Sequence, residues 1–192
     1  MENMPEKYPV HYPRVGRVNL LYLTTLVLVA LVGGLMQFFS ASWGLLATEF
    51  ILILAPALLF VHLSGLPWRA TLRWRRPTIQ AGGLSLLAGL GLAPVGMWLA
   101  GITAAVLGYA PLLTPDFFPR TPGQAVLIFL GLAVAAPLCE EVLFRGVIQR
   151  GYERFGPKIA ILSTGILFIF FHLSFFRIWA IWPIAFVLCF LA

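Results

Sequence analysis

The chain alternates between long apolar runs and short polar segments. The apolar runs cover residues 18–39, 45–64, 79–107, 123–139, 159–176 and 178–192. A helix needs about 20 apolar residues to cross a bilayer, whereas the core of a signal peptide has only about 7–15. The pattern therefore predicts an all-α fold, a polytopic transmembrane helical bundle of about six spans, in which the first span is retained.

Composition narrows the class of protein further. Hydrophobic residues make up 60% of the 192 residues and charged residues only 10%, whereas a soluble domain carries about 25% charged residues. The net charge of +6 comes from basic residues in the polar segments, which is typical of membrane topology and does not indicate a nucleic-acid partner. Cys139 and Cys189 both lie in apolar runs, so we interpret them as small hydrophobes.

The basic residues also predict how the chain is oriented. The segments 1–17, 65–77 and 145–158 hold eleven of the thirteen lysines and arginines, and the other two are Arg120 and Arg177. Positive loops remain on the cytoplasmic side. We therefore expect a cytoplasmic N-terminal lead at 1–17, and a plasma or inner membrane location if the source is bacterial. The arginines at 69–76 are then topology signals and lipid-headgroup contacts.

Glu140 and Glu141 are the most unusual residues, because they follow nineteen uncharged residues, Thr121 to Cys139. An ionised side chain at the centre of a membrane helix costs about 2.5–3.5 kcal/mol on insertion scales. An acidic pair in this place is therefore expected to serve a function. The alternative is an ordinary helix end with a solvated ion pair.

A helical hairpin brings a histidine to the same depth as this pair. Gly156-Pro157 combines a residue typical of a helix end with one typical of a helix start. Glu140 lies sixteen residues before Gly156 and His172 sixteen after it, which is about 24 Å along each helix. A carboxylate beside an imidazole could activate a water molecule. A core histidine bonded to a backbone carbonyl is the alternative for His172.

The neighbouring residues suggest separate roles for the two glutamates. Arg145 lies four residues after Glu141, so the two can pair along one helix face. Glu140 lies about 100° away on the same helix and can point elsewhere. Phe168 lies four residues before His172 and is expected to pack on the histidine face.

These residues resemble the motifs of the CPBP family. Glu140-Glu141-Val-Leu-Phe-Arg145 has the pattern EExxxR, and Phe168-Ile-Phe-Phe-His172 has the pattern FxxxH. The family comprises CAAX prenyl endopeptidases and bacteriocin-processing enzymes, which are also described as abortive-infection proteins. The resemblance covers residues 123–192, expected to form the catalytic core, while residues 18–122 hold spans 1–3 and their loops.

The resemblance implies an intramembrane endopeptidase that cleaves a peptide bond near the cytoplasmic membrane face. It assigns water activation to Glu140 and His172, and support of the site to Glu141 and Arg145, with Phe168 beside them. Prenylated proteins, leader peptides and bacteriocin precursors are all open as substrates. No cofactor is required for this chemistry, although Zn²⁺ held by Glu140 and His172 stays open. Two ligands are fewer than the three protein ligands usual for catalytic zinc.

The family also carries a third motif in a later span, a histidine followed four residues later by asparagine or a similar residue. The histidines of this chain are His11, His62 and His172, and the run from residue 178 has fifteen residues. A complete span needs about 20. We therefore expect an incomplete last span and a chain truncated from about eight spans. The alternative function is a non-catalytic membrane scaffold or transport accessory.

Two features of the first spans are open to interpretation. Glu49 lies near the start of the second apolar run; we favour a side chain that reaches the outer surface over one that lines the interior. The third run contains Gly82, Gly83, Gly89, Gly91 and Gly101. Small residues allow membrane helices to approach closely, so this run is expected to pack tightly.

Overall fold

The computed structural model describes residues 12–73, 78–108 and 118–191, and each element in these ranges is a helix. Four helices are long and apolar enough to cross a membrane, judged by length and composition: Val15–Phe39, Ala41–Leu63, Gly82–Val106 and Pro122–Phe155. Two shorter apolar helices are Pro157–Phe171 and Ile181–Phe190. The predicted polytopic helical bundle is confirmed.

The first two spans form a hairpin. The first span is built from α1 (Val15–Leu28), the π-helical stretch η1 (Val29–Gly33) and α2 (Gly34–Phe39). The second span follows Ser40 and is built from α3 (Ala41–Ala47), the π-helical stretch η2 (Thr48–Leu54) and α4 (Ala55–Leu63). The side chain of Ser40 accepts a hydrogen bond from the amide of Trp43, which caps the start of α3.

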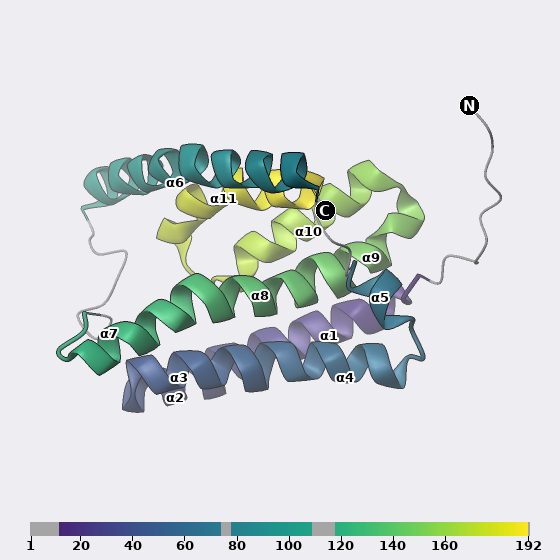
Figure 1. Ribbon diagram of the computed structural model, residues 1–192, viewed down its shortest axis with the longest axis horizontal. Coiled ribbons are helices and arrows are strands. Elements are labelled where there is room, and N and C mark those ends of the chain that lie inside the picture. Colours follow the sequence, from purple (N-terminus) through teal and green to yellow (C-terminus); the bar gives the residue numbers. More distant parts are fainter. Residues whose placement is uncertain (1–11, 74–77, 109–117, 192) are drawn as a thin grey trace.

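A short helix, α5 (Trp68–Thr71), and a long one, α6 (Ile79–Leu107), come next. The helix from Pro122 to Phe155, here called the central helix, then runs through the middle of the bundle (Figure 1). It comprises α7 (Pro122–Phe129), η4 (Leu130–Ala135), α8 (Ala136–Glu140), η5 (Glu141–Ile148), α9 (Gln149–Tyr152) and η6 (Glu153–Phe155). Helices α10 (Pro157–Phe171) and α11 (Phe175–Leu191) complete the described chain.

The turn between the central helix and α10 has the predicted form. Gly156 has a φ of +97°, and Pro157 opens α10. Glycine adopts a positive φ without the steric penalty that a Cβ brings, and proline fits the first helical turn. The chain therefore reverses at Gly156, and the central helix and α10 form the expected hairpin.

The predicted boundary between the last two runs is wrong by a few residues. The apolar run that continues to residue 176 in the sequence is divided after Phe171, where α10 ends, and α11 begins at Phe175. The turn lies at residues 172–174, and Leu173 has a φ of +47°. Hydropathy could not place this turn because the residues on both sides of it are apolar.

The central helix supplies a large share of the fully buried core. Its side chains Leu143, Phe144, Val147 and Ile148 have no exposed surface. Around them pack Val18 and Tyr22 from α1, residues of η2 and α4, and Phe168 and Phe171 from α10. In Figure 1 the first two spans lie along one side of the central helix, and α6 and α11 lie side by side on the other. The buried residues of the central helix therefore lie between these two groups of helices.

The third span packs along α11, but its glycines do not form the close contact that the sequence suggests. A Cβ added at Gly82, Gly83, Gly89, Gly91 or Gly101 would meet nothing within 4 Å. Only 11% of the apolar window of this helix is buried. The glycines close to other elements lie elsewhere, for example at Gly44, where a Cβ would overlap the backbone of Met36 and Gln37.

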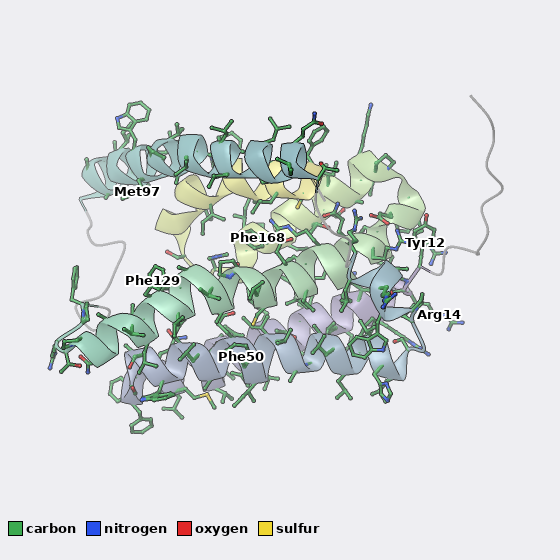
Figure 2. The ribbon with its side chains drawn as sticks, in the orientation of Figure 1. Tyr12, Arg14, Phe50, Met97, Phe129 and Phe168 are labelled. Atoms are coloured by element: carbon green, nitrogen blue, oxygen red, sulfur yellow. The ribbon has the colours of Figure 1, made fainter. Side chains whose placement is uncertain are left out.

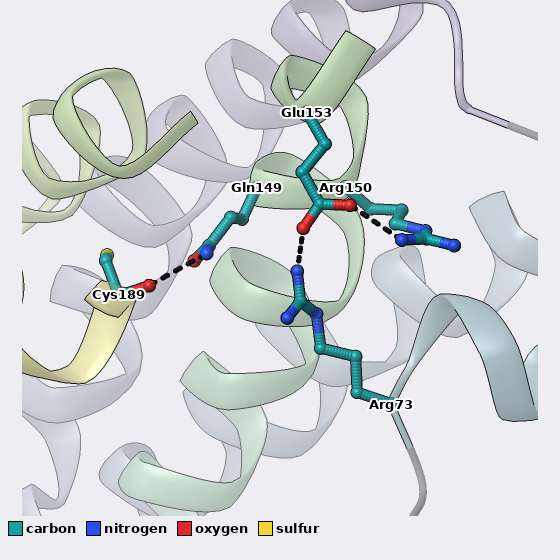
Figure 3. A network of polar contacts seen from close by, with 5 residues as sticks. All are labelled: Arg73, Gln149, Arg150, Glu153 and Cys189. Atoms are coloured by element: carbon teal, nitrogen blue, oxygen red, sulfur yellow. Dashed lines mark hydrogen bonds and ion pairs between the residues drawn. The ribbon is translucent and has the colours of Figure 1, made fainter. Parts of the chain in front are cut away.

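Polar contacts hold the end of the central helix (Figure 3). Glu153 forms ion pairs with Arg73, which follows α5, and with Arg150, the latter at 2.6 Å. The amide nitrogen of Gln149 donates a hydrogen bond of 2.9 Å to the backbone carbonyl of Cys189 in α11. Arg73 thus has a protein partner in addition to its expected role as a topology signal.

Several predicted features lie outside the described residues. They are the N-terminal lead up to residue 11, the arginines Arg75 and Arg76, and most of the proline-rich loop before Pro122.

Candidate active site

Glu140 and His172 meet across the hairpin. The Oε1 atom of Glu140 lies 3.8 Å from Nε2 of His172. Both side chains are largely buried, with 18% and 19% of their surface exposed. The equal spacing of the two residues from Gly156 predicted this juxtaposition, and the structure confirms it.

The other ring nitrogen of His172 is held by its own helix. Nδ1 lies 3.0 Å from the backbone carbonyl oxygen of Phe168, one turn earlier in α10. A carbonyl oxygen can only accept, so Nδ1 carries the proton in this contact, and Nε2 is the ring nitrogen that lies nearer Glu140. The alternative interpretation of His172 as bonded to a backbone carbonyl is thus also correct, but it describes only one side of the ring.

Glu141 points away from Glu140, as its place on the helix predicts. It is 46% exposed and lies 3.4 Å from the Nε atom of Arg145, which is only 3% exposed. The guanidinium carbon of Arg145 lies 4.5 Å from the centre of the Phe168 ring, a cation–π arrangement. Arg145 therefore connects Glu141 to the residue that holds the His172 ring.

Aromatic rings enclose this part of α10. Phe168 packs edge-on against Phe144 at 4.9 Å and against the His172 ring at the same distance. Phe171 lies 5.1 Å from Phe144, and the hydroxyl of Tyr22 donates a 3.0 Å hydrogen bond to the backbone carbonyl of Leu167. Phe168 lies among the helices in the interior of the bundle (Figure 2). These contacts fix α10 against the central helix and α1.

Glu140 and His172 line a cavity of about 700 Å³ between the layers of helices. Its walls are mainly apolar and come from the first two spans, α6, the central helix, α10 and α11; they include Val29, Leu45, Ile53, Met97, Leu132, Phe171 and Ile181. Ligand sites are commonly cavities of about 300–1,000 Å³ with apolar walls and a few polar groups. This cavity has the size and the chemistry of such a site.

Glu49 also lines this cavity, which overturns the favoured prediction that it reaches the outer surface. Its side chain belongs to η2 and is only 5% exposed. The helix η2 packs against α8 of the central helix, and that contact turns Glu49 inward. The sequence does not indicate the true direction of Glu49, because hydropathy does not show which face of a span meets its neighbour.

The described residues do not form a complete metal centre. No group of three or more His, Cys, Asp or Glu side chains with a metal-binding arrangement occurs in residues 12–73, 78–108 and 118–191. Glu140 and His172 supply two donors, whereas catalytic zinc commonly has three protein ligands.

Comparison with protein families adds a decisive observation. Residues 122–192 match the family described as Rce1-like, type II CAAX prenyl endopeptidase Rce1-like. Residues 122–192 are therefore similar to this family and are here called the Rce1-like segment. The Rce1-like segment contains Glu140, Glu141, Arg145, Phe168 and His172, and the match confirms the resemblance to the CPBP family. No curated protein and no solved structure matches the chain.

The Rce1-like segment and the apolar helices support the same broad class. The family consists of membrane proteases, and four described helices are long and apolar enough to span a bilayer. The chain is therefore an integral membrane protein whose C-terminal part is similar to a family of peptidases.

Proposed function

We propose that this protein is an intramembrane endopeptidase in which Glu140 and His172 activate water to hydrolyse a peptide bond. The contact between these two side chains carries the proposal, because it joins the two family motifs in one cavity. A separation of 3.8 Å is longer than a hydrogen bond, but one water molecule can contact both Oε1 and Nε2.

The proposed step uses both residues as proton acceptors. A water molecule between them donates hydrogen bonds to the Glu140 carboxylate and to Nε2 of His172. As its oxygen attacks the carbonyl carbon of the peptide bond, one of these groups takes its proton. The other then orients the oxygen, and the proton is returned to the amine that leaves when the C–N bond breaks. Both side chains are largely buried, and their reduced contact with bulk water strengthens these electrostatic contacts.

Glu141, Arg145 and Phe168 support the pair of Glu140 and His172 indirectly. The carbonyl of Phe168 orients the His172 ring, and the guanidinium of Arg145 lies over the Phe168 ring. Glu141 compensates the charge of Arg145 at 3.4 Å. The three residues would therefore maintain the direction of Nε2 without contacting the water.

Peptide substrates with an apolar group suit the cavity best, because its walls are mainly apolar. This chemistry fits the prenylated C-terminal peptides cleaved by CAAX-type enzymes and also hydrophobic leader peptides. The basic segments predict a cytoplasmic N-terminus. In this orientation the peptide bond would be cleaved near the cytoplasmic face of the membrane.

The test is cleavage of internally quenched peptides, prenylated and unprenylated, by the full chain in lipid nanodiscs. Glu140→Gln and His172→Ala should each reduce kcat by about 100-fold or more, because each removes a proton acceptor. Glu153→Gln and His62→Ala are matched controls outside the cavity and should retain activity. Cleavage by Glu140→Gln and His172→Ala at the wild-type rate would refute the proposal. Binding of peptides by the wild-type chain without cleavage would favour the scaffold alternative.

A further inference from the structure

Glu49 is a buried carboxylate that the proposed hydrolysis does not use. One of its oxygens, Oε2, has no hydrogen-bond partner, and only 5% of the side chain is exposed. It lines the cavity that also contains Glu140 and His172 but belongs to a different span. It also lies close enough to Glu140 for the two carboxylates to interact electrostatically.

A carboxylate in this position needs a donor or a cation, because removing a charge from water is costly unless it is paired. Two polar side chains of the same span hairpin make contacts with each other or with the backbone. The hydroxyl of Thr48 donates to the backbone carbonyl of Gly44 at 2.8 Å. The amide nitrogen of Gln37 lies 3.4 Å from the Thr48 oxygen. The described lining of the cavity includes no lysine or arginine.

The cavity around this carboxylate is lined mainly by hydrophobic residues. Val29, Leu45, Met97 and Leu132 all line the cavity, and Ile53 lies one helical turn beyond Glu49. An apolar ligand that carries a single cationic group would fill the cavity and pair with Glu49. An acidic group in the same place would be repelled by both Glu49 and Glu140, and such repulsion contributes to specificity.

We propose that Glu49 is a specificity-determining residue that binds the ammonium or guanidinium group of a lysine or arginine side chain in the peptide substrate. The inference rests on the proposed peptidase function and assigns the substrate class of the same cavity. The basic side chain would extend toward Glu49 while the bond to be cleaved lies at Glu140 and His172. Glu49 therefore positions and selects the peptide and takes no part in the proton transfers.

The test measures peptide binding separately from cleavage. Leucine-rich peptides, acetylated and amidated at their ends, carry lysine, norleucine or glutamate at one position, which is scanned along the peptide. Their affinity for the full chain in nanodiscs is read by fluorescence anisotropy. The wild-type chain should bind the best lysine peptide about tenfold or more tightly than its norleucine partner, since a charge-assisted hydrogen bond contributes a factor of this size.

Two variants of Glu49 show whether this residue causes the preference. Glu49→Gln should reduce the lysine preference to about twofold or less, and Glu49→Lys should favour the glutamate peptide. Glu153→Gln, the matched control outside the cavity, should bind like the wild type. An unchanged lysine preference in Glu49→Gln, or no preference in the wild type, would overturn the inference. The norleucine peptide is also tested with a free amino terminus. If affinity increases only with this terminal amine and not with a lysine side chain, the inference is overturned as well.

Thermal unfolding separates this role from a structural one. Because Oε2 has no protein partner, Glu49→Gln without peptide should unfold at the same temperature as the wild type or higher. A clearly lower unfolding temperature would show that Glu49 stabilises the fold, and this would also overturn the inference. Cleavage of the same peptides is recorded in parallel. A lysine preference in binding without cleavage would refute the peptidase and leave the Glu49 contact standing.

Discussion

The hydroxyl of Tyr22 donates a hydrogen bond to the backbone carbonyl of Leu167, at 3.0 Å, and so joins the first span to the helix that ends at His172. The ring of Tyr22 also lies 6.0 Å from that of Phe171. The first span lies outside the Rce1-like segment, yet it holds the segment's histidine-bearing helix.

Tyr22→Phe removes this hydrogen bond and retains the ring. We expect a loss of about 0.5–1 kcal/mol in the free energy of unfolding, as for a typical hydrogen bond between membrane helices, together with a lower kcat. Equilibrium unfolding in mixed micelles measures the loss. Tyr12→Phe is the control, because the Tyr12 hydroxyl makes no hydrogen bond within the described part of the chain. Equal stability of the two variants would contradict the prediction.

Arg145→Met should destabilise the protein by about 1–3 kcal/mol, because it removes a buried cation from Glu141 and from the Phe168 ring. The stability of Arg145→Lys should lie between those of Arg145→Met and the wild type, since lysine retains the charge but not the planar stacking group. Chemical unfolding in detergent measures both. Arg154 also lies over a phenylalanine ring, that of Phe155, but is exposed. If Arg154→Met lowers the free energy of unfolding as much as Arg145→Met does, burial of the arginine is not the reason for the effect.

Gly44→Ala should be among the most damaging small substitutions. The added Cβ would meet backbone atoms of Met36 and Gln37. Backbone atoms cannot move away by a change of rotamer, as a side chain can. Overpacking of this kind costs about 1–3 kcal/mol. Gly89→Ala is the matched variant in α6, where a Cβ meets nothing within 4 Å, and it should be neutral or stabilise by up to about 1 kcal/mol. Thermal unfolding of both variants checks the difference, and similar losses would refute the packing described for α6.

The orientation deduced from basic residues can be tested with cysteine labelling. Arg154→Cys and Phe118→Cys place thiols at exposed positions on opposite ends of the central helix. A membrane-impermeant maleimide should label position 118 in intact cells and position 154 only in inverted vesicles. The native Cys139 and Cys189 are buried, so the background should be low. Labelling in the reverse pattern would place the N-terminus outside.

The hairpin was predictable because its determinants are local. Gly156-Pro157 indicates a turn from two adjacent residues, and the helical rise then sets Glu140 level with His172. The pairing of Glu141 with Arg145 follows in the same way from their spacing. Both contacts occur in the structure.

Contacts between distant spans could not be predicted in this way. The inward direction of Glu49 depends on the packing of η2 against α8, and the sequence contains no signal that pairs these two segments. The contact of Tyr22 with Leu167 joins residues 145 positions apart. The end of α10 at Phe171 depends on the turn at residues 172–174, which lies within a continuous apolar stretch.

The turn at Gly156 has a consequence for how the sequence can change. It is the common origin from which the positions of Glu140 and His172 are both measured, sixteen residues away in each direction. One residue inserted between Glu140 and Gly156 would rotate the glutamate by about 100° and move it about 1.5 Å along the bundle. No single substitution nearby could restore the alignment. The segment from Glu140 to Gly156 should therefore tolerate insertions far less than it tolerates substitutions.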